Sequence, residues 1–141
     1  MRRKGGNKKR AKKERSRDEI DFDGLLDAVL NDDVEKFQII MNHAPNPDIY
    51  FSSSKFQIPK IIGTLPPILS LCVFFTAKEC TDALLKMRPK VDKTDKFGRT
   101  PAHFAAAGGD LELINKIAEK GASFGILDAL GDHPISYAAM F

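Results

Sequence analysis

The sequence predicts an all-α solenoid, in which stacked helix–turn–helix units with short hairpin loops follow a disordered basic tail. Three observations predict this fold class. Apolar residues recur at three- and four-residue spacing from Phe22 onward, the pattern of a buried helix face. A short motif of Asp, Gly and Pro returns after 33 residues. The charge of the chain also changes sign at Asp18.

The predicted tail comprises residues 1–17. It holds ten Lys or Arg and one Glu, for a net charge of +9, whereas residues 18–141 hold twelve basic and eighteen acidic residues, for a net −6. The tail has no large apolar residue beyond Met1, so it cannot bury surface and we expect it to be disordered. Residues 18–141 are expected to form a single repeat domain.

The first predicted unit covers residues 22–48 and contains two short helices. Their apolar stripes are separated by the polar run Asn31-Asp32-Asp33. Asp32 or Asp33 can cap the second helix, because a carboxylate accepts hydrogen bonds from the free amides at a helix N-terminus.

An insertion at about residues 48–62 follows the first unit. It contains a run of three Ser residues and also several large apolar residues, which argue against plain disorder. Two interpretations stay open: a long hairpin that folds onto the array, or a loop that contacts a partner.

Three further units are predicted at residues 63–94, 95–127 and 128–141. In the first of them, Pro66 precedes a helix that extends to Phe75, because Pro is favoured in the first helical turn. A second helix is predicted over residues 78–87. The unit at 128–141 is partial, since it stops in its first helix.

A repeated motif links the last two units. Asp95-x-x-Gly98-x-Thr100-Pro101 returns as Asp128-x-x-Gly131-x-His133-Pro134. Residues 95–122 resemble the ankyrin repeat family, and a weaker resemblance extends over most of 22–141. The residues that carry the structural motif are Thr100, Pro101, His103, Ala105, Ala106, Gly109 and Gly121.

These residue types suit a stacked unit. Pro101 fixes φ at a helix start, and the small side chains of Ala105 and Ala106 permit close packing against neighbouring helices. Gly121 suits a left-handed cap at a helix end. The resemblance implies that His103 is structural and bonded to Thr100; a catalytic histidine would need a nucleophile or acid partner, and the sequence shows none.

Composition argues against several function classes. Cys72 and Cys80 are expected to be buried free thiols in a reducing compartment, so the chain is expected to be intracellular, in cytoplasm or nucleus. We expect no metal, cofactor, catalysis or small-molecule substrate, because no ligand set or phosphate-binding loop is recognisable. The apolar run at 61–77 contains two Pro and is expected to be core, not a membrane span.

The resemblance implies that the chain binds another protein through a concave surface of hairpin tips and first-helix ends. Phe97 and Arg99 are the first choice of contact, because aromatic residues and Arg are favoured at binding hot spots. The full set carried over by position is Lys96, Phe97, Arg99, Ala129, Leu130, Asp132, Ile61, Ile62 and Thr64.

The tail supports an alternative function. Its compact basic cluster is of the kind that nuclear import receptors bind, and it could also contact nucleic-acid phosphates. It has no aromatic residue on which bases could stack, so nucleic-acid binding would be non-specific and sensitive to salt. The plain alternative is a solubilising tail. The cluster consists of Lys8, Lys9, Arg10, Lys12 and Lys13.

The last predicted unit ends on apolar residues, namely Ile135, Tyr137, Met140 and Phe141. Terminal repeats usually present a polar outer face to solvent. We therefore expect either that the chain is a shortened product or that it pairs through this end.

Overall fold

The computed structural model describes residues 19–52 and 65–141 and confirms the all-α class. The described residues form helices and loops, and their one β-like feature is a single antiparallel bridge between Tyr50 and Pro67. The helices are α2 (Phe22–Asn31), α3 (Val34–Met41), α4 (Ile68–Phe74), α5 (Lys78–Lys86), α6 (Pro101–Gly108), α7 (Leu111–Glu119) and α8 (Pro134–Met140).

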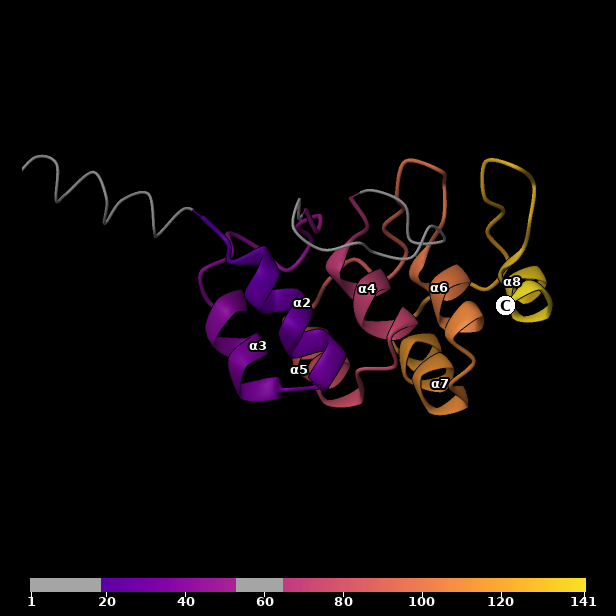
Figure 1. The fold of residues 1–141 in the computed structure, drawn as a ribbon. Helices are drawn as coiled ribbons and strands as arrows, with labels where there is room; N and C mark the ends of the chain where they lie inside the picture. Colours follow the sequence, from indigo (N-terminus) through magenta and orange to yellow (C-terminus); the bar gives the residue numbers. More distant parts are fainter. Residues whose placement is uncertain (1–18, 53–64) are drawn as a thin grey trace, which may run out of the picture.

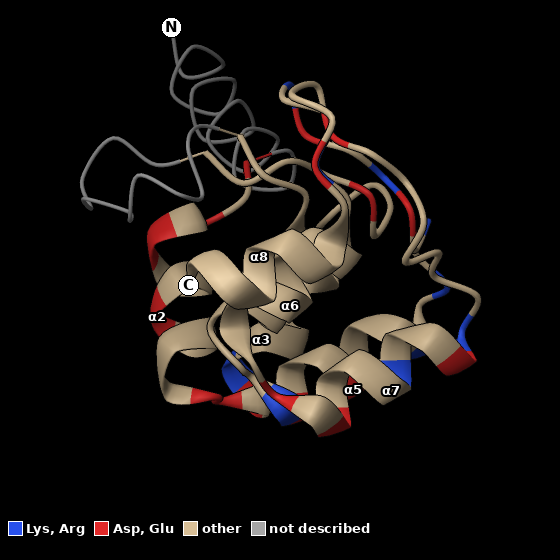
Figure 2. Ribbon diagram, turned by 90° about the vertical axis from the view of Figure 1, so that its right-hand side faces the viewer, with Lys and Arg blue, Asp and Glu red and all other residues tan. Residues whose placement is uncertain are grey.

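The helices form two layers. Helices α2, α4, α6 and α8 follow one another along the array, and α3, α5 and α7 form a second row beside them (Figure 1). Helix α6 packs against α4 on one side and α8 on the other, while α3 packs against α5. The loops before α6 and α8 project away from the helices on one side, as the view from the α8 end shows (Figure 2). This is the stacked arrangement that the repeat predicts.

The core lies between the two layers. Leu25, Phe37, Leu71, Leu84 and Phe104 are all fully buried, and they come from successive helix pairs. Each pair therefore buries its apolar face partly against the next pair, which is the source of stability in repeat arrays.

Two neighbouring aspartates cap two different helices. Asp33 is the N-cap of α3, and its carboxylate accepts the amide of Lys36 at 3.2 Å. Asp32 instead reaches the next unit, where its carboxylate accepts the amides of Glu79 at 3.1 Å and Cys80 at 3.0 Å. Since the N-cap of α5 offers no side-chain acceptor, Asp32 supplies the cap across the interface.

The segments on either side of residues 53–64 meet each other. Phe51 donates its amide to Pro66 O at 2.7 Å, and Ile68 donates to Ile49 O at 3.2 Å. The Phe51 side chain is fully buried and packs edge-on against Phe22. Residues 53–64, between these segments, lie outside the described part of the chain.

Candidate partner-binding surface

The loops before α6 and α8 have the same construction. The Asp95 carboxylate accepts the amides of Phe97 and Arg99, each at 2.9 Å. The Asp128 carboxylate accepts the amides of Leu130 and Asp132, also at 2.9 Å each. Each aspartate thus fixes the turn that follows it, as short polar side chains do in Asx turns.

The two tips are also fixed relative to each other. Ala129 donates its amide to Phe97 O at 2.9 Å, a bond that joins one tip to the next. Gly98 lies beneath this contact with a φ of 74°, and a Cβ placed on it would lie 3.0 Å from Ala129 N. A side chain at Gly98 would therefore be strained both by the backbone and by the neighbouring tip.

His103 connects the helix to the following tip. Thr100 donates its amide to His103 Nδ1 at 3.1 Å, so Nδ1 is an acceptor and the proton lies on Nε2. His103 Nε2 then donates to Asp132 O at 2.9 Å. The Thr100 hydroxyl lies 2.9 Å from Nδ1 as well. With both ring nitrogens bonded and the side chain fully buried, His103 holds the array together.

The side chains of the two tips that solvent can reach, four of them exposed and one half-buried, form what we call the tip surface: Lys96, Phe97, Ala129, Leu130 and Asp132. Phe97 is 47% exposed and Leu130 is 88% exposed, although both are large and apolar. The Lys96 ammonium lies 5.2 Å from the centre of the Phe97 ring. Asp132 is half-buried, and its backbone amide and carbonyl are both hydrogen-bonded.

Arg99 differs from the exposed contact that the sequence suggested. It is only 8% exposed, and its Nε donates to the Asp95 carboxylate at 2.8 Å. Its guanidinium lies over Phe104 at 4.7 Å and over Phe97 at 5.1 Å. A cation held by a buried carboxylate and two aromatic faces supports the tip from within. We therefore leave Arg99 out of the tip surface.

Several predicted site residues lie outside the described part of the chain. These are Ile61, Ile62 and Thr64 of the earlier unit, and Lys8, Lys9, Arg10, Lys12 and Lys13 of the basic cluster.

The remaining motif residues lie in α6 or follow the ends of α6 and α7. Pro101, Ala105 and Ala106 are buried, whereas Gly109 and Gly121 have positive φ after their helices. Gly108 is the last residue of α6 and lies against α4. A Cβ on it would lie 2.9 Å from the carbonyl oxygens of Val73 and Phe74.

The sequence pattern did not indicate Tyr137 as a site residue. In the structure, Tyr137 takes over part of the role that the Thr100–His103 pair has in the preceding unit. The unit at 128–141 lacks the Thr–His pair, and the N-cap of α8 makes no side-chain bond. Instead, the Tyr137 hydroxyl donates to the Asp128 carboxylate at 2.7 Å. Tyr137 is buried against His103, while Ile135, Met140 and Phe141 are exposed. Only the repeat alignment with Phe104 could have indicated a buried ring at this position.

The two cysteines are free and fully buried. Burial raises the pKa of the Cys72 thiol well above its ordinary value. Burial, together with the adjacent Asp32 carboxylate, raises the pKa of the Cys80 thiol to about 12. A redox sensor needs a thiolate that reagents can reach, and neither thiol provides one.

Within 19–52 and 65–141, no three His, Cys, Asp or Glu side chains converge in a way that could hold a metal ion. None of the helices in these ranges has the length and apolar character needed to cross a bilayer.

Helix pairs in two rows, with rigid hairpin tips, define a repeat scaffold. Residues 69–117 match the family described as ankyrin repeats (many copies). The match includes the motif around Thr100 and His103, so the predicted resemblance is confirmed for this stretch. Ankyrin repeats are protein–protein interaction modules.

The chain is also similar to palmitoyltransferase ZDHHC13. It is 38% identical to the mouse protein over 61 residues, and 36% identical to the human and Pongo abelii proteins over the same length. This match covers 43% of the chain and 10% of each relative. The match therefore spans about a tenth of the length of these relatives.

Proposed function

We propose that the array binds a partner protein through the tip surface and performs no catalysis. One observation carries this proposal: two large apolar side chains, Phe97 and Leu130, are exposed on loops that are fixed internally and to each other. Exposed apolar groups on a rigid support lose little conformational entropy when a partner covers them.

The chemistry of the tip surface suits an interface that combines apolar and charged contacts. Phe97 and Leu130 provide an apolar centre, and Lys96 and Asp132 provide one charge of each sign beside it. Protein interfaces combine apolar anchors with a polar rim in this way. Asp95 accepts the amide of Phe97 and pairs with Arg99, and it thus keeps the Phe97 backbone in place before binding.

The absence of catalysis is part of the same proposal. His103, the side chain in the motif best suited to acid–base chemistry, is buried and uses both ring nitrogens in structural bonds. The similarity to palmitoyltransferases is no reason to propose transferase activity for this chain, because the match covers only 10% of their length.

Affinity capture with matched variants tests the proposal. The double variant Phe97→Ala, Leu130→Ala should lose captured proteins from a cell lysate at about 0.15 M salt. Ile39→Ala, which truncates an apolar side chain that is 63% exposed on α3, is the control and should capture the same proteins as the wild type. Equal capture by the double variant would show that the tip surface is not the contact.

A second function is favoured by charge: binding of an import receptor or of nucleic acid through residues 2–17, with the repeats as a regulatory module. The observation behind it is the net charge of +9 in residues 1–17. Such binding should weaken steeply between low and moderate salt, whereas binding by the tip surface should not. Removal of residues 2–17 should abolish it. We further propose that the chain acts in the cytoplasm or nucleus.

A further inference from the structure

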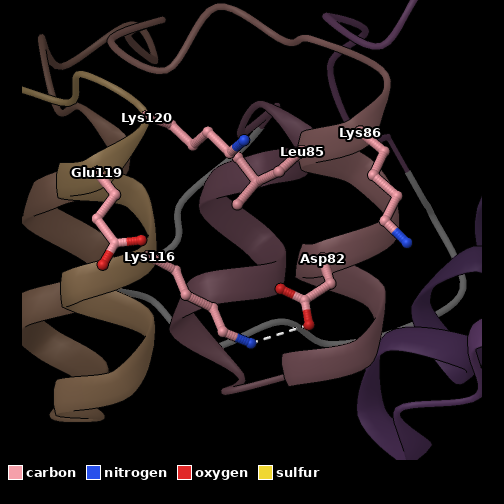
Figure 3. Close-up of a pocket in the computed structure, with 6 residues that line it drawn as sticks. All are labelled: Asp82, Leu85, Lys86, Lys116, Glu119 and Lys120. Carbon is pink, nitrogen blue, oxygen red and sulfur yellow. Dashed lines mark hydrogen bonds and ion pairs between the residues drawn. The ribbon is translucent and has the colours of Figure 1, made fainter.

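A second surface lies on the row of helices formed by α3, α5 and α7, away from the tips. Helices α5 and α7 enclose a depression of about 300 Å³, lined by Asp82, Leu85, Lys86, Lys116, Glu119 and Lys120 (Figure 3). A second depression, of about 280 Å³, shares Leu85 and Lys120 with the first and continues to Arg88, Pro89 and Val91. We call the two together the outer groove.

The outer groove holds cations without partners. Lys116 is engaged, since it lies 2.9 Å from the Asp82 carboxylate and 3.5 Å from Glu112. Lys86, Arg88 and Lys120 form no ion pair with any residue in the described ranges. Against them stands one lining carboxylate that is likewise unpaired in these ranges, Glu119, so the outer groove carries a net positive charge.

Helix ends explain two of these charges but not the third. Lys86 ends α5 and Lys120 caps the end of α7, where a cation interacts favourably with the helix dipole. Arg88 lies beyond the last turn of α5, where this benefit has faded. Its charge therefore needs a different explanation.

The backbone of Arg88 strengthens this point. Arg88 has a φ of 58°, and its amide donates to Leu85 O at 3.1 Å. The equivalent residue after α7 is Gly121, with a φ of 99° and the same bond to Ala118 O at 3.0 Å. A side chain strains the backbone in this left-handed conformation, and Gly avoids that strain. One repeat thus uses the unstrained residue, and the other keeps an arginine at the edge of the outer groove.

The floor of the outer groove is apolar. Leu85 is 6% exposed at the point where the two depressions meet, and Pro89 and Val91 are half-buried beside it. A ligand that fits must therefore carry negative charges on both sides of an apolar group.

We propose that the outer groove binds an acidic peptide segment of a partner protein. Leu85 contacts an apolar side chain of the segment, and Lys86, Arg88 and Lys120 pair with its carboxylates. A run of nucleic-acid phosphates fits less well, because it carries no apolar side chain to contact Leu85. The described residues that line the two depressions also include no aromatic ring for base stacking.

The test uses the full ¹⁵N-labelled chain and a synthetic peptide with two Glu on either side of a Leu, at about 0.15 M salt. The expected result is a saturable set of NMR shifts at the amides of residues 85–91 and Lys120. The same peptide with Gln in place of Glu should give none. Shifts confined to residues 2–17, or to the tip surface, would overturn the proposal.

The Arg88→Gly variant distinguishes an effect on peptide binding from an effect on folding. Because Gly occupies the equivalent position after α7, this variant should unfold at the same temperature as the wild type or higher. Its affinity for the Glu peptide should fall about fivefold. Lys90→Gln, a charge loss at an exposed neighbour that does not line the groove, should change affinity by less than about twofold.

Two further outcomes would overturn the proposal. Arg88→Gly could bind the Glu peptide as well as the wild type does. Alternatively, inorganic tripolyphosphate could produce the same shifts at a lower concentration than the peptide, which would identify the occupant as a phosphate group.

Discussion

The Tyr137 hydroxyl donates a 2.7 Å hydrogen bond to the Asp128 carboxylate, and this bond joins α8 to the tip that precedes it. The same carboxylate orders that tip through the amides of Leu130 and Asp132. One buried acid therefore fixes both the last helix and the most exposed part of the tip surface.

Tyr137→Phe should destabilise the protein by about 2 kcal/mol, because a buried hydrogen bond to a charged group is lost. Urea unfolding followed by circular dichroism measures the change. Tyr50→Phe is the control, since its exposed hydroxyl makes a longer 3.3 Å bond to Thr94 O and its loss should cost less than about 1 kcal/mol. Equal losses in the two variants would contradict this role of Asp128.

Acid should weaken the attachment of α8. Burial opposes ionisation of Asp128, but hydrogen bonds from the Tyr137 hydroxyl and two tip amides outweigh it, so the pKa of this carboxyl is lowered. Its contribution to stability is then present above the unfolded-state pKa of about 3.9, and is lost as pH falls through the folded-state pKa.

The pH effect is measured as the difference in unfolding free energy between the wild type and Asp128→Asn. This difference should shrink between about pH 5 and pH 3, since other carboxyls titrate alike in both proteins. A difference that does not change over this range would show that Asp128 has no lowered pKa.

Asp32→Ala should cost about 1 kcal/mol and loosen the start of α5, although Asp32 belongs to the preceding unit. Hydrogen exchange should become faster at the amides of Glu79 and Cys80. Asp33→Ala should leave these amides protected and expose Lys36 N instead. If both variants exposed the same amides, the assignment of Asp32 as the N-terminal cap of α5 would be wrong.

The thiols of Cys72 and Cys80 should be inert while the protein is folded. Both are fully buried, and the Cys80 pKa of about 12 leaves almost no thiolate at neutral pH. Labelling with a chromogenic disulfide should therefore be slow in buffer and immediate in denaturant. Rapid labelling of the folded chain would contradict the packing between α4 and α5.

Gly98→Ala should destabilise the protein more than Gly121→Ala. Both residues have positive φ, but an added methyl at Gly98 lies 3.0 Å from Ala129 N, whereas nothing lies within 4 Å at Gly121. Positive φ alone costs about 1 kcal/mol, and the contact adds to it only at Gly98. Thermal unfolding of the two variants checks the order, and the reverse order would contradict the close contact between tips.

The sequence by itself determined the repeat architecture. The spacing of apolar residues predicts where α2, α3 and α5 lie, because that pattern depends only on neighbours within two turns. The return of the Asp–Gly–Pro motif after 33 residues predicts that units stack, since one helix pair cannot bury both of its faces. The resemblance to ankyrin repeats implied the positions of Lys96, Phe97 and Leu130 on hairpin tips.

The tertiary structure decided which partner each polar group takes. Asp32 and Asp33 have equal capping chemistry, and only the stacking of units assigns one of them to α5. Arg99 is a surface residue by composition, yet the Asp95 carboxylate and two Phe rings enclose it. The outer groove likewise joins Leu85 to Lys120, a full repeat apart. These contacts cross between units, so they depend on how closely the units stack, a distance that no local residue pattern encodes.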